Sequence, residues 1–258
     1  MNELSDEALE RYARHIFLRE IGGPGQKRLL SARAAVVGAG GLGSPAILYL
    51  AAAGLGRITV IDDDTVSLSN LQRQILHRTA DIGRPKVESA AEHVAALNPG
   101  VTVHPLAERL EEGNAEALLA GHDLVLDGCD SLETRRIVNR AAFELGIPVV
   151  SGAISQWEGQ VTVFDPASGT PCYACVFPED PAAGLAPSCA EAGVMGALPG
   201  VVGAMMALEA IKLVTEAGHV LRGEMLVFDG LWGESRKLRL KPRPGCPVCG
   251  GAPAAEAG

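Results

Sequence analysis

The stretch RAAVVGAGGLGSPAILYLAAAGLGRITVIDDD, residues 33–64, decides the fold expected for this chain. Its apolar run at 34–37 is typical of a strand that is buried on both faces. Residues 44–53 then indicate a helix of small side chains, and residues 57–61 indicate a second buried strand. The stretch therefore predicts a βαβ unit, in which the helix connects two parallel strands.

Four glycines lie at the turn between the first strand and the helix. Gly38, Gly40 and Gly43 have the spacing G-x-G-x-x-G, with an additional glycine at Gly41. Glycines let the backbone approach a phosphate, and the helix N-terminus offers free N–H groups and partial positive charge. Asp62 follows the second strand, nineteen residues after Gly43, close to the usual position of an acid that binds ribose. The turn predicts a nucleotide site without identifying the nucleotide.

The rest of the chain extends this unit in two ways. Alternating strands and helices up to Gly152 imply a parallel, doubly wound sheet. Its further strands are expected at 101–105, 123–127 and 148–151, and its helices at 86–97, 115–120 and 132–145. Three later segments alternate apolar and polar residues, as antiparallel strands do: 159–164, 224–228 and 236–240. We therefore expect an α/β, Rossmann-like, doubly wound and mostly parallel sheet, extended by antiparallel C-terminal strands.

The N-terminal segment and the length of the chain predict its remaining organisation. A helix is expected over 3–17 with Ser5 as its N-cap, ended by the glycine cluster at 22–25, and a short helix over 26–31. The length of 258 residues fits a single domain. We divide it into an N-terminal helical arm (1–31), a nucleotide-binding half (32–152), a second half with a cysteine knuckle (153–250) and a tail (251–258).

Charge and hydropathy exclude several classes of protein. The net charge of −9 gives no general attraction to nucleic acid or to anionic membranes. The polar N-terminus contains no signal region, so we expect a cytoplasmic protein. The apolar stretch 192–208 is interrupted by Pro199 and is short for a membrane span, so a buried helix is the better interpretation.

Four of the six cysteines form two C-x-x-C pairs. Cys172 and Cys175 form the first pair, and Cys246 and Cys249 the second. Four thiolates in this arrangement are typical of a closed, structural zinc site. Two disulfides or a redox-active pair are the alternatives, and both are disfavoured in the cytoplasm.

The other two cysteines have less defined roles. Cys129 follows a buried strand and is interpreted as a residue that fills space. Cys189 precedes the helix expected from Ala192, and a helix N-terminus lowers the pKa of a thiol. A small buried side chain is the equally weighted alternative for Cys189.

Polar side chains follow the second and fourth strands, at the ligand-facing edge of such a sheet. Arg73 and Lys86 supply cations for a polyphosphate, and Asp130, at the end of the fourth strand, is suited to hold Mg²⁺. The polar segment 62–74, which follows the second strand, also carries several candidate nucleotide ligands: Asp62, Asp64, Ser69, Asn70 and Gln74. These residues favour MgATP over a nicotinamide cofactor, and the sequence contains no G-x-x-x-x-G-K-[ST] motif.

At this point the sequence resembles a known family, the MoeB/ThiF-type adenylating enzymes, which are related to the ubiquitin-activating enzymes. The resemblance covers residues 3–250, and its motifs are GAGGLGS (38–44), SNLQRQ (69–74), RPK (84–86), Asp130, EAGVMG (191–196) and the two C-x-x-C pairs. It implies that the chain binds MgATP and a ubiquitin-like sulfur carrier protein ending in Gly-Gly. The carrier's terminal carboxylate would receive AMP and pyrophosphate would leave, ahead of thiocarboxylate formation in molybdopterin or thiamine biosynthesis.

The resemblance also implies a role for each matching residue. Gly41 would face the α-phosphate, and Asp62 would bind the ribose. Asn70, Arg73 and Lys86 would hold the phosphates, and Asp130 would coordinate Mg²⁺. Arg14 would enter the active site of a partner subunit, which implies a homodimer, and residues 153–250 would bind the carrier. Cys189 would take part in sulfur transfer in the ThiF-like members and be dispensable in the MoeB-like members.

Two departures from the family pattern refine these expectations. Ser131 stands among the nucleotide-binding positions where many relatives carry Asn, and we expect a small effect on nucleotide contacts. The chain ends soon after Cys249 without a rhodanese-like domain, so sulfur would come from a separate desulfurase or rhodanese-like protein. An NAD(P)-dependent oxidoreductase and a non-catalytic, zinc-clipped binding scaffold remain as alternatives. Activation of a tRNA carboxylate is disfavoured by the acidic charge.

Overall fold

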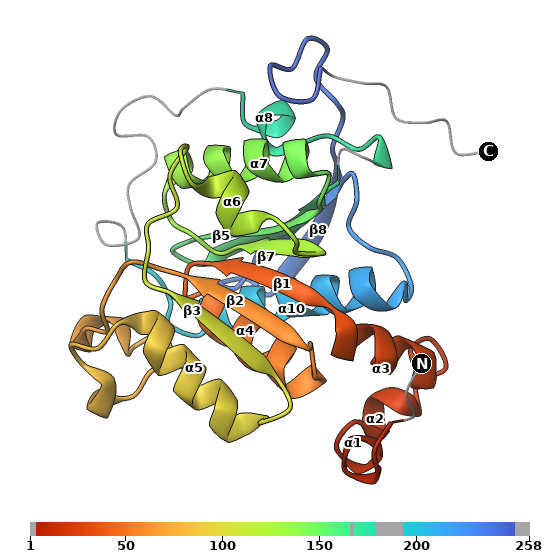
Figure 1. Cartoon of the computed structure of the whole chain (residues 1–258). Coiled ribbons are helices and arrows are strands. Elements are labelled where there is room, and N and C mark those ends of the chain that lie inside the picture. Colours follow the sequence, from red (N-terminus) through yellow and green to blue (C-terminus); the bar gives the residue numbers. More distant parts are fainter. Residues whose placement is uncertain (1–3, 166–167, 179–192, 251–258) are drawn as a thin grey trace.

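The computed structural model describes residues 4–165, 168–178 and 193–250. Within these residues one sheet has eight strands in the order β3-β2-β1-β4-β5-β6-β7-β8 (Figure 1). The strands are β1 (Arg33–Val37), β2 (Arg57–Ile61), β3 (Thr102–Leu106), β4 (Leu124–Asp127), β5 (Val149–Ser155), β6 (Glu158–Phe164), β7 (Glu224–Asp229) and β8 (Glu234–Arg239). Strands β1 to β5 pair in parallel, and β5 to β8 pair antiparallel. This confirms the predicted doubly wound sheet and its antiparallel extension.

Helices cover both faces of the sheet. They are α1 (Asp6–Arg11), α2 (Ala13–Ile16), α3 (Gly22–Ser31), α4 (Gly43–Ala53), α5 (Lys86–Leu97), α6 (Ala115–Leu119), α7 (Leu132–Leu145), α8 (Tyr173–Val176) and α10 (Leu198–Thr215), with short 3-10 turns η1 (Leu68–Asn70) and η2 (Thr79–Asp81). In Figure 1, α6, α7 and α8 lie on one face, and α4, α5 and α10 lie on the other. Helix α5 has the bounds that the sequence predicts.

The two layers of helices produce two hydrophobic cores. Successive residues of a strand point to opposite faces, so Val36 packs with α4 and α10 while Val37 packs with α6 and α7. Strand β4, with its four residues buried, lies between both cores. At the outer edge of the sheet, all six residues of β8 are exposed. Helices therefore cover the central strands of the sheet, whereas its antiparallel edge is exposed to solvent.

Helix α10 begins later than the sequence predicts. It starts at Leu198, so Pro199 lies in its first turn, where a proline needs no backbone hydrogen bond, rather than interrupting it. The helix approaches α4 closely, because a side chain at Gly203 would lie 2.4 Å from the carbonyl oxygen of Leu42. It is long and apolar enough to cross a membrane, but half of it is buried in this fold against the sheet and α4. The predicted buried helix is confirmed.

The N-terminal arm differs from its prediction at two points. The helix expected over 3–17 is broken at Tyr12, whose hydroxyl accepts a hydrogen bond from Asn98 Nδ2 (2.9 Å) and whose ring fills the space beside Gly54. Burial of this one ring against the domain accounts for the kink. Helix α3 starts at Gly22, inside the glycine cluster that we expected to separate two helices.

Candidate active site

The glycine turn has a conformation that only glycine allows at two positions. Gly38 has a positive φ of 92°, in the region that other residues rarely adopt. A side chain at Gly43 would lie 1.8 Å from the carbonyl oxygen of Gly38. With any other residue at this position, the start of α4 could not come this close to the end of β1. The turn therefore folds tightly under the N-terminus of α4, as the motif predicts.

Asp62 lies beside this turn and is already bonded to it. One carboxylate oxygen accepts the N–H of Ala39 (2.7 Å) and the other accepts the N–H of Asp64 (2.9 Å). Burial raises the pKa of Asp62, although the Lys86 charge and these two N–H groups oppose the rise. The structure thus adds a second role to the predicted ribose ligand, because Asp62 also holds the glycine turn in place.

The segment SNLQRQ lies directly against the turn. The carbonyl of Asn70 accepts the N–H groups of Arg73 and Gln74, and Arg73 donates to the carbonyl of Ser69 (3.2 Å). The aliphatic part of Arg73 lies 3.7 Å from the position that a side chain on Gly41 would take. Gln74 is buried next to Gly40, and its Oε1 has no hydrogen-bond partner within the described residues. Arg73 and Gln74 are therefore brought to the turn as predicted.

Lys86 is a buried ammonium at the first residue of α5. Its side chain is 5% exposed, and its Nζ lies 2.8 Å from Oδ2 of Asp64. A buried ammonium is costly without an opposite charge, so the ion pair with Asp64 stabilises it at this position. The arrangement places one fixed positive charge beside Asp62 and the glycine turn, where a phosphate would benefit from it.

Asp130 lies in a loop that contacts the glycine turn. Strand β4 ends at Asp127, so Asp130 follows the strand by three residues rather than ending it. A side chain on Gly38 would meet the carbonyl oxygen of Gly128 at 3.2 Å, which places this loop against the turn. Asp130 is exposed there, whereas the Ser131 hydroxyl caps α7 by accepting the N–H of Thr134 (3.3 Å). Asp130 therefore presents an exposed carboxylate next to the glycine turn, whereas the hydroxyl of Ser131 is already engaged.

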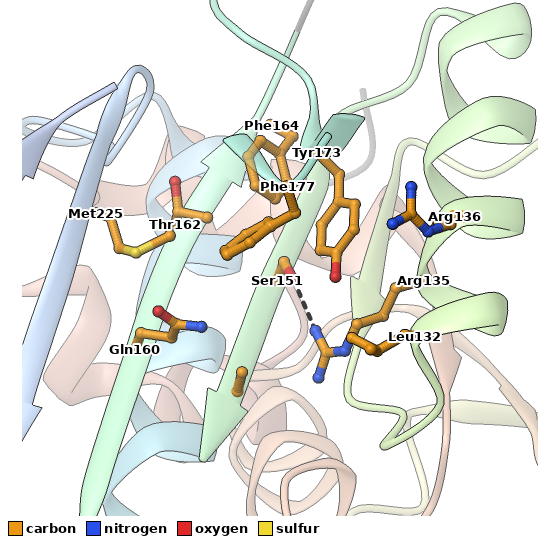
Figure 2. A pocket seen from close by; sticks show the side chains of 11 residues that line it. Leu132, Arg135, Arg136, Ser151, Gln160, Thr162, Phe164, Tyr173, Phe177 and Met225 are labelled. Carbon is orange, nitrogen blue, oxygen red and sulfur yellow. Dashed lines mark hydrogen bonds between the residues drawn. The ribbon is translucent and has the colours of Figure 1, made fainter. Parts of the chain in front are cut away.

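A buried arginine fixes the loop of Asp130. The guanidinium of Arg135 donates to Asp127 Oδ2 (3.1 Å) and to the carbonyls of Cys129 (2.6 Å) and Gly152 (2.7 Å). It also donates to Ser151 Oγ (3.1 Å), the contact drawn in Figure 2. This clamp ties the end of β4 and the loop after it to β5.

Cys129 takes part in the same cluster. Its thiol donates to Asp127 Oδ1 (2.8 Å), and burial, followed by the nearby Asp127 charge, raises its pKa well above the usual value. The thiol therefore stays protonated and serves as a structural group, in agreement with its predicted role.

A cavity of about 210 Å³ adjoins this loop on the face of the sheet next to α7 (Figure 2). Its wall is made of three aromatic rings, two arginines and smaller side chains: Leu132, Arg135, Arg136, Ser151, Ala153, Gln160, Thr162, Phe164, Tyr173, Phe177 and Met225. Phe164 and Tyr173 meet edge to face, with their centroids 5.8 Å apart. Leu132 and Arg135 line this cavity and follow Asp130 closely in sequence, so the cavity lies beside the Asp130 loop.

The four paired cysteines converge as the sequence predicts. Their sulfur atoms lie within 4.8 Å of one another, with Cys172 to Cys246 at 3.6 Å and Cys175 to Cys249 at 3.3 Å. Sulfurs around a tetrahedral ion at about 2.3 Å would lie about 3.8 Å apart, so the cluster fits a metal of that size. All four thiols are free, which excludes disulfides among them in this structure. Although burial opposes ionisation, the N–H groups of Cys249 and Val248 lower the pKa of Cys246 to about 7.

Two predicted residues do not join the site within one chain. Arg14 is exposed in α2, which packs on α3 at the amino ends of the strands, whereas the glycine turn lies at their carboxyl ends (Figure 1). Cys189 lies outside the described residues. Among the residues from 193 onward that the structure describes, the first helix starts at Leu198.

The sequence reasoning missed a set of buried polar side chains behind the glycine turn. His77, Asp81 and Ser89 are each at most 5% exposed, and Ser89 Oγ lies within hydrogen-bond distance of His77 Nδ1 (2.9 Å) and of Asp81 Oδ2 (3.0 Å). A signal was available, because Ser89 and His93 interrupt the apolar face of α5. Polar residues on the inner face of a helix need partners, and the partners lie in the preceding loop.

Known proteins are similar to this chain over most of its length. The model of the ThiF family matches residues 12–248. The SAMP-activating enzyme E1 of Haloferax volcanii is 49% identical over 242 residues, which cover 94% of this chain and 89% of that protein. The sulfur carrier protein adenylyltransferase of Thermus thermophilus is 48% identical, covering 96% and 93%. The molybdopterin-synthase adenylyltransferase of Salmonella typhimurium is 46% identical, covering 97% and 100%. Among solved structures, MccB of Escherichia coli has the same fold, with a TM-score of 0.83 at 21% identity over 99% of this chain and 76% of that chain.

The Arg135 clamp leads to a prediction about stability. We expect Arg135→Met to lower the free energy of unfolding by about 3–5 kcal/mol, because it leaves the buried carboxylate of Asp127 unpaired. The double variant Asp127→Asn/Arg135→Met should lose less than the single variant, since no buried charge remains. Arg140→Met, which removes an exposed ion pair on the same helix, should change stability by less than about 1 kcal/mol. Urea unfolding followed by circular dichroism measures all three, and a double variant as unstable as Arg135→Met would contradict the assignment.

Proposed function

This chain belongs to the ThiF family, and from that premise we propose that it adenylates the C-terminal carboxylate of a ubiquitin-like sulfur carrier protein ending in Gly-Gly. ATP is the AMP donor, and the acyl-adenylate precedes thiocarboxylate formation in molybdopterin or thiamine biosynthesis. The observation that carries the proposal is the meeting of the glycine turn, the buried Lys86 and the loop of Asp130 at one edge of the sheet. The names of the Thermus and Salmonella relatives support the same reaction.

The nucleotide would lie across this edge. In the proposed arrangement the turn from Gly38 to Gly43 faces the α-phosphate, Asp62 binds the ribose, and Arg73 and Lys86 hold the phosphates. Asp64, Ser69, Asn70, Gln74 and Ser131 complete the nucleotide site. Gln74 supports this placement, because its amide nitrogen lies beside Gly40, where it can donate to a phosphate oxygen.

The reaction needs charge neutralisation more than proton transfer. A carboxylate oxygen of the carrier attacks the α-phosphorus and forms a new O–P bond. The bond between the α-phosphorus and the oxygen that bridges to the β-phosphorus breaks, and pyrophosphate leaves with that oxygen. The attacking carboxylate is already ionised, so the site requires no general base. Arg73, Lys86 and the N–H groups of the turn would stabilise the negative charge that develops on the transferred phosphoryl group. Asp130 would hold Mg²⁺, which supplies further positive charge to the phosphates.

The carrier would bind to the half of the chain formed by residues 153–250. The cavity beside the Asp130 loop is smaller than ordinary ligand pockets of roughly 300–1,000 Å³, so it suits a narrow segment such as a Gly-Gly tail. Exposed aromatic and aliphatic residues gather at the antiparallel end of the sheet, among them Trp157, Leu231 and Trp232. Exposed apolar groups of this kind mark interaction surfaces.

We further propose that the enzyme is a cytoplasmic homodimer. Arg14 lies at the amino ends of the strands, whereas the nucleotide would lie at their carboxyl ends. A second chain would therefore have to supply the arginine. Exposed apolar side chains on neighbouring helices, Tyr49 on α4 and Leu208 on α10, support such an interface. Sulfur would come from a separate desulfurase or rhodanese-like protein, with Cys189 as the candidate thiol for its transfer.

The cysteine cluster is proposed to hold a structural zinc ion. Four sulfurs would fill a tetrahedral coordination sphere, so no position remains for a water or a substrate. Zinc would therefore stabilise the contact between α8 and the segment that follows β8, without a chemical step of its own.

The adenylation proposal is tested by exchange of labelled pyrophosphate into ATP. We expect exchange only with a carrier that ends in Gly-Gly, and a loss of about 100-fold or more in Asp130→Asn, because a charge-stabilising group is removed. Glu133→Gln, which changes an exposed carboxylate three residues away, should retain the rate. Absence of exchange with every such carrier, or NADH binding without ATP binding, would contradict the proposal.

The proposed role of Arg14 is tested by mixing inactive subunits. If Arg14 acts on its partner's site, Arg14→Ala and Asp130→Ala chains that are each inactive should regain about a quarter of wild-type exchange after co-refolding, since half of the dimers then have one intact site. If each chain used its own Arg14, mixing would restore nothing.

The zinc proposal is tested by metal analysis. Plasma emission spectroscopy should find one zinc per chain in the wild type and in Cys129→Ser, and much less in Cys249→Ser. The Cys249 variant should also unfold at a lower temperature, because metal binding contributes to folding stability. Full zinc content in Cys249→Ser would exclude this cluster as the site.

A further inference from the structure

His77 is a buried histidine that touches the glycine turn from behind. Its side chain lies in the loop between η1 and η2 and is 5% exposed. Its Nε2 lies 3.0 Å from the carbonyl oxygen of Ala39, and its Nδ1 lies 2.9 Å from Ser89 Oγ on α5. His77 therefore links the turn to the helix that begins with Lys86.

The peptide groups on both sides of Ala39 are held. Asp62 accepts its N–H (2.7 Å), and His77 is the close partner of its carbonyl oxygen, with the Ser44 hydroxyl at the longer distance of 3.4 Å. The turn between Gly38 and Gly40 is flexible by composition, so these contacts restrict the conformations that its glycines would otherwise reach.

The direction of the Ala39 carbonyl determines the direction of the next N–H. In a planar trans peptide the C=O of one residue and the N–H of the following residue point in opposite directions. With the Ala39 carbonyl turned toward His77, the N–H of Gly40 must point away from His77. No atom of the described residues accepts this N–H, which leaves it available to a ligand.

The hydrogen bonds also determine the tautomer of His77. A carbonyl oxygen only accepts, so Nε2 must carry a hydrogen. Burial lowers the pKa of His77, and the positive charge of Lys86 lowers it further, against the opposing effects of the Ala39 carbonyl, Asp62 and Asp81. The ring is therefore neutral at neutral pH, with its hydrogen on Nε2. Ser89 has one hydroxyl hydrogen, which lies within reach of both Nδ1 (2.9 Å) and Asp81 Oδ2 (3.0 Å), and the proposed tautomer requires that Nδ1 accepts it. Asp81 Oδ2, which also lies 3.0 Å from this hydroxyl, keeps the backbone N–H of Arg78 as a donor.

We propose that His77 is a positioning residue of the nucleotide site, which as the Nε2–H tautomer holds the Ala39 carbonyl so that the Gly40 N–H faces the bound phosphate. This inference rests on the proposed function, because it takes a nucleoside triphosphate as the ligand of the turn. It adds a residue that does not touch the nucleotide but determines the shape of the loop that does. Ser89 supports the ring from the far side and joins the loop to the helix that presents Lys86.

The test compares three variants in their affinity for a non-hydrolysable ATP analogue, measured by calorimetry. His77→Ala should weaken binding about tenfold, the equivalent of one hydrogen bond. His77→Gln should bind within about threefold of the wild type, because its amide can donate to the same carbonyl. In exchange assays, His77→Ala should raise the KM for ATP without changing the KM for the carrier.

His93→Ala is the matched control. His93 is equally buried on α5 and bonds the carbonyl of Leu76, but it makes no contact with the glycine turn. Its loss should lower the melting temperature and leave the affinity for the analogue unchanged. An equal loss of affinity in His93→Ala and His77→Ala would overturn the proposal, since it would show a general effect of the buried network.

The tautomer provides a measurement that is independent of nucleotide binding. Long-range ¹H–¹⁵N spectra of the free protein should show His77 with a protonated Nε2 and an unprotonated Nδ1. The Nδ1–H tautomer, or wild-type affinity in His77→Ala, would overturn the inference. A wild-type protein that binds no ATP analogue would instead overturn the proposed function, so the two failures are distinguishable. If His77→Ala does not fold, the glutamine variant and the tautomer still decide the question.

Discussion

The contact between Gly43 and the Gly38 carbonyl is the constraint on which the rest of the structure depends. Because α4 starts almost on top of the end of β1, the turn between them is compact, and its neighbours can reach it from three sides. Pro199 of α10 approaches Gly41, Gly128 approaches Gly38, and Arg73 covers the same turn. A larger residue at Gly43 would separate these segments, and the parts of the site would no longer meet.

Buried charges at this edge are acceptable because each has a partner in place. Lys86 is paired with Asp64, and Arg135 with Asp127, so neither ion is left without compensation in the interior. The two pairs differ in exposure, however. Asp64 is mostly exposed, which leaves Lys86 close to solvent and to an incoming phosphate, whereas Asp127 and Arg135 are both enclosed. The first pair is therefore suited to binding and the second to holding the backbone.

Much of the fold could be predicted from the sequence, since it depends on local patterns. The glycine spacing, the apolar runs and the alternating strands predicted the sheet and its antiparallel end. The two C-x-x-C pairs, Cys172/Cys175 and Cys246/Cys249, predicted a cluster although they are far apart in sequence. The break at Tyr12 was not predictable, because it depends on Asn98 and Gly54, which are distant in sequence. The predicted start of α10 differs from the observed one because the apolar run begins at Ala192, whereas the helix begins at Leu198 with Pro199 in its first turn.

Within the site, the charged residues that stand in sequence motifs were predictable and the buried polar residues behind the glycine turn were not. Arg73, Lys86 and Asp130 stand in a recognisable motif order, but His77 and Ser89 acquire their meaning only when the fold places them behind the turn. The connection between the cysteine cluster and the cavity likewise becomes visible only in the fold. Tyr173 lies between Cys172 and Cys175 in sequence and also forms part of the cavity wall, so a metal bound by the four sulfurs would also hold that ring. The N–H of Tyr173 also donates to Asn139 Oδ1 on α7 (2.8 Å), so a metal at the cluster would act together with this bond on the shape of the cavity beside Asp130.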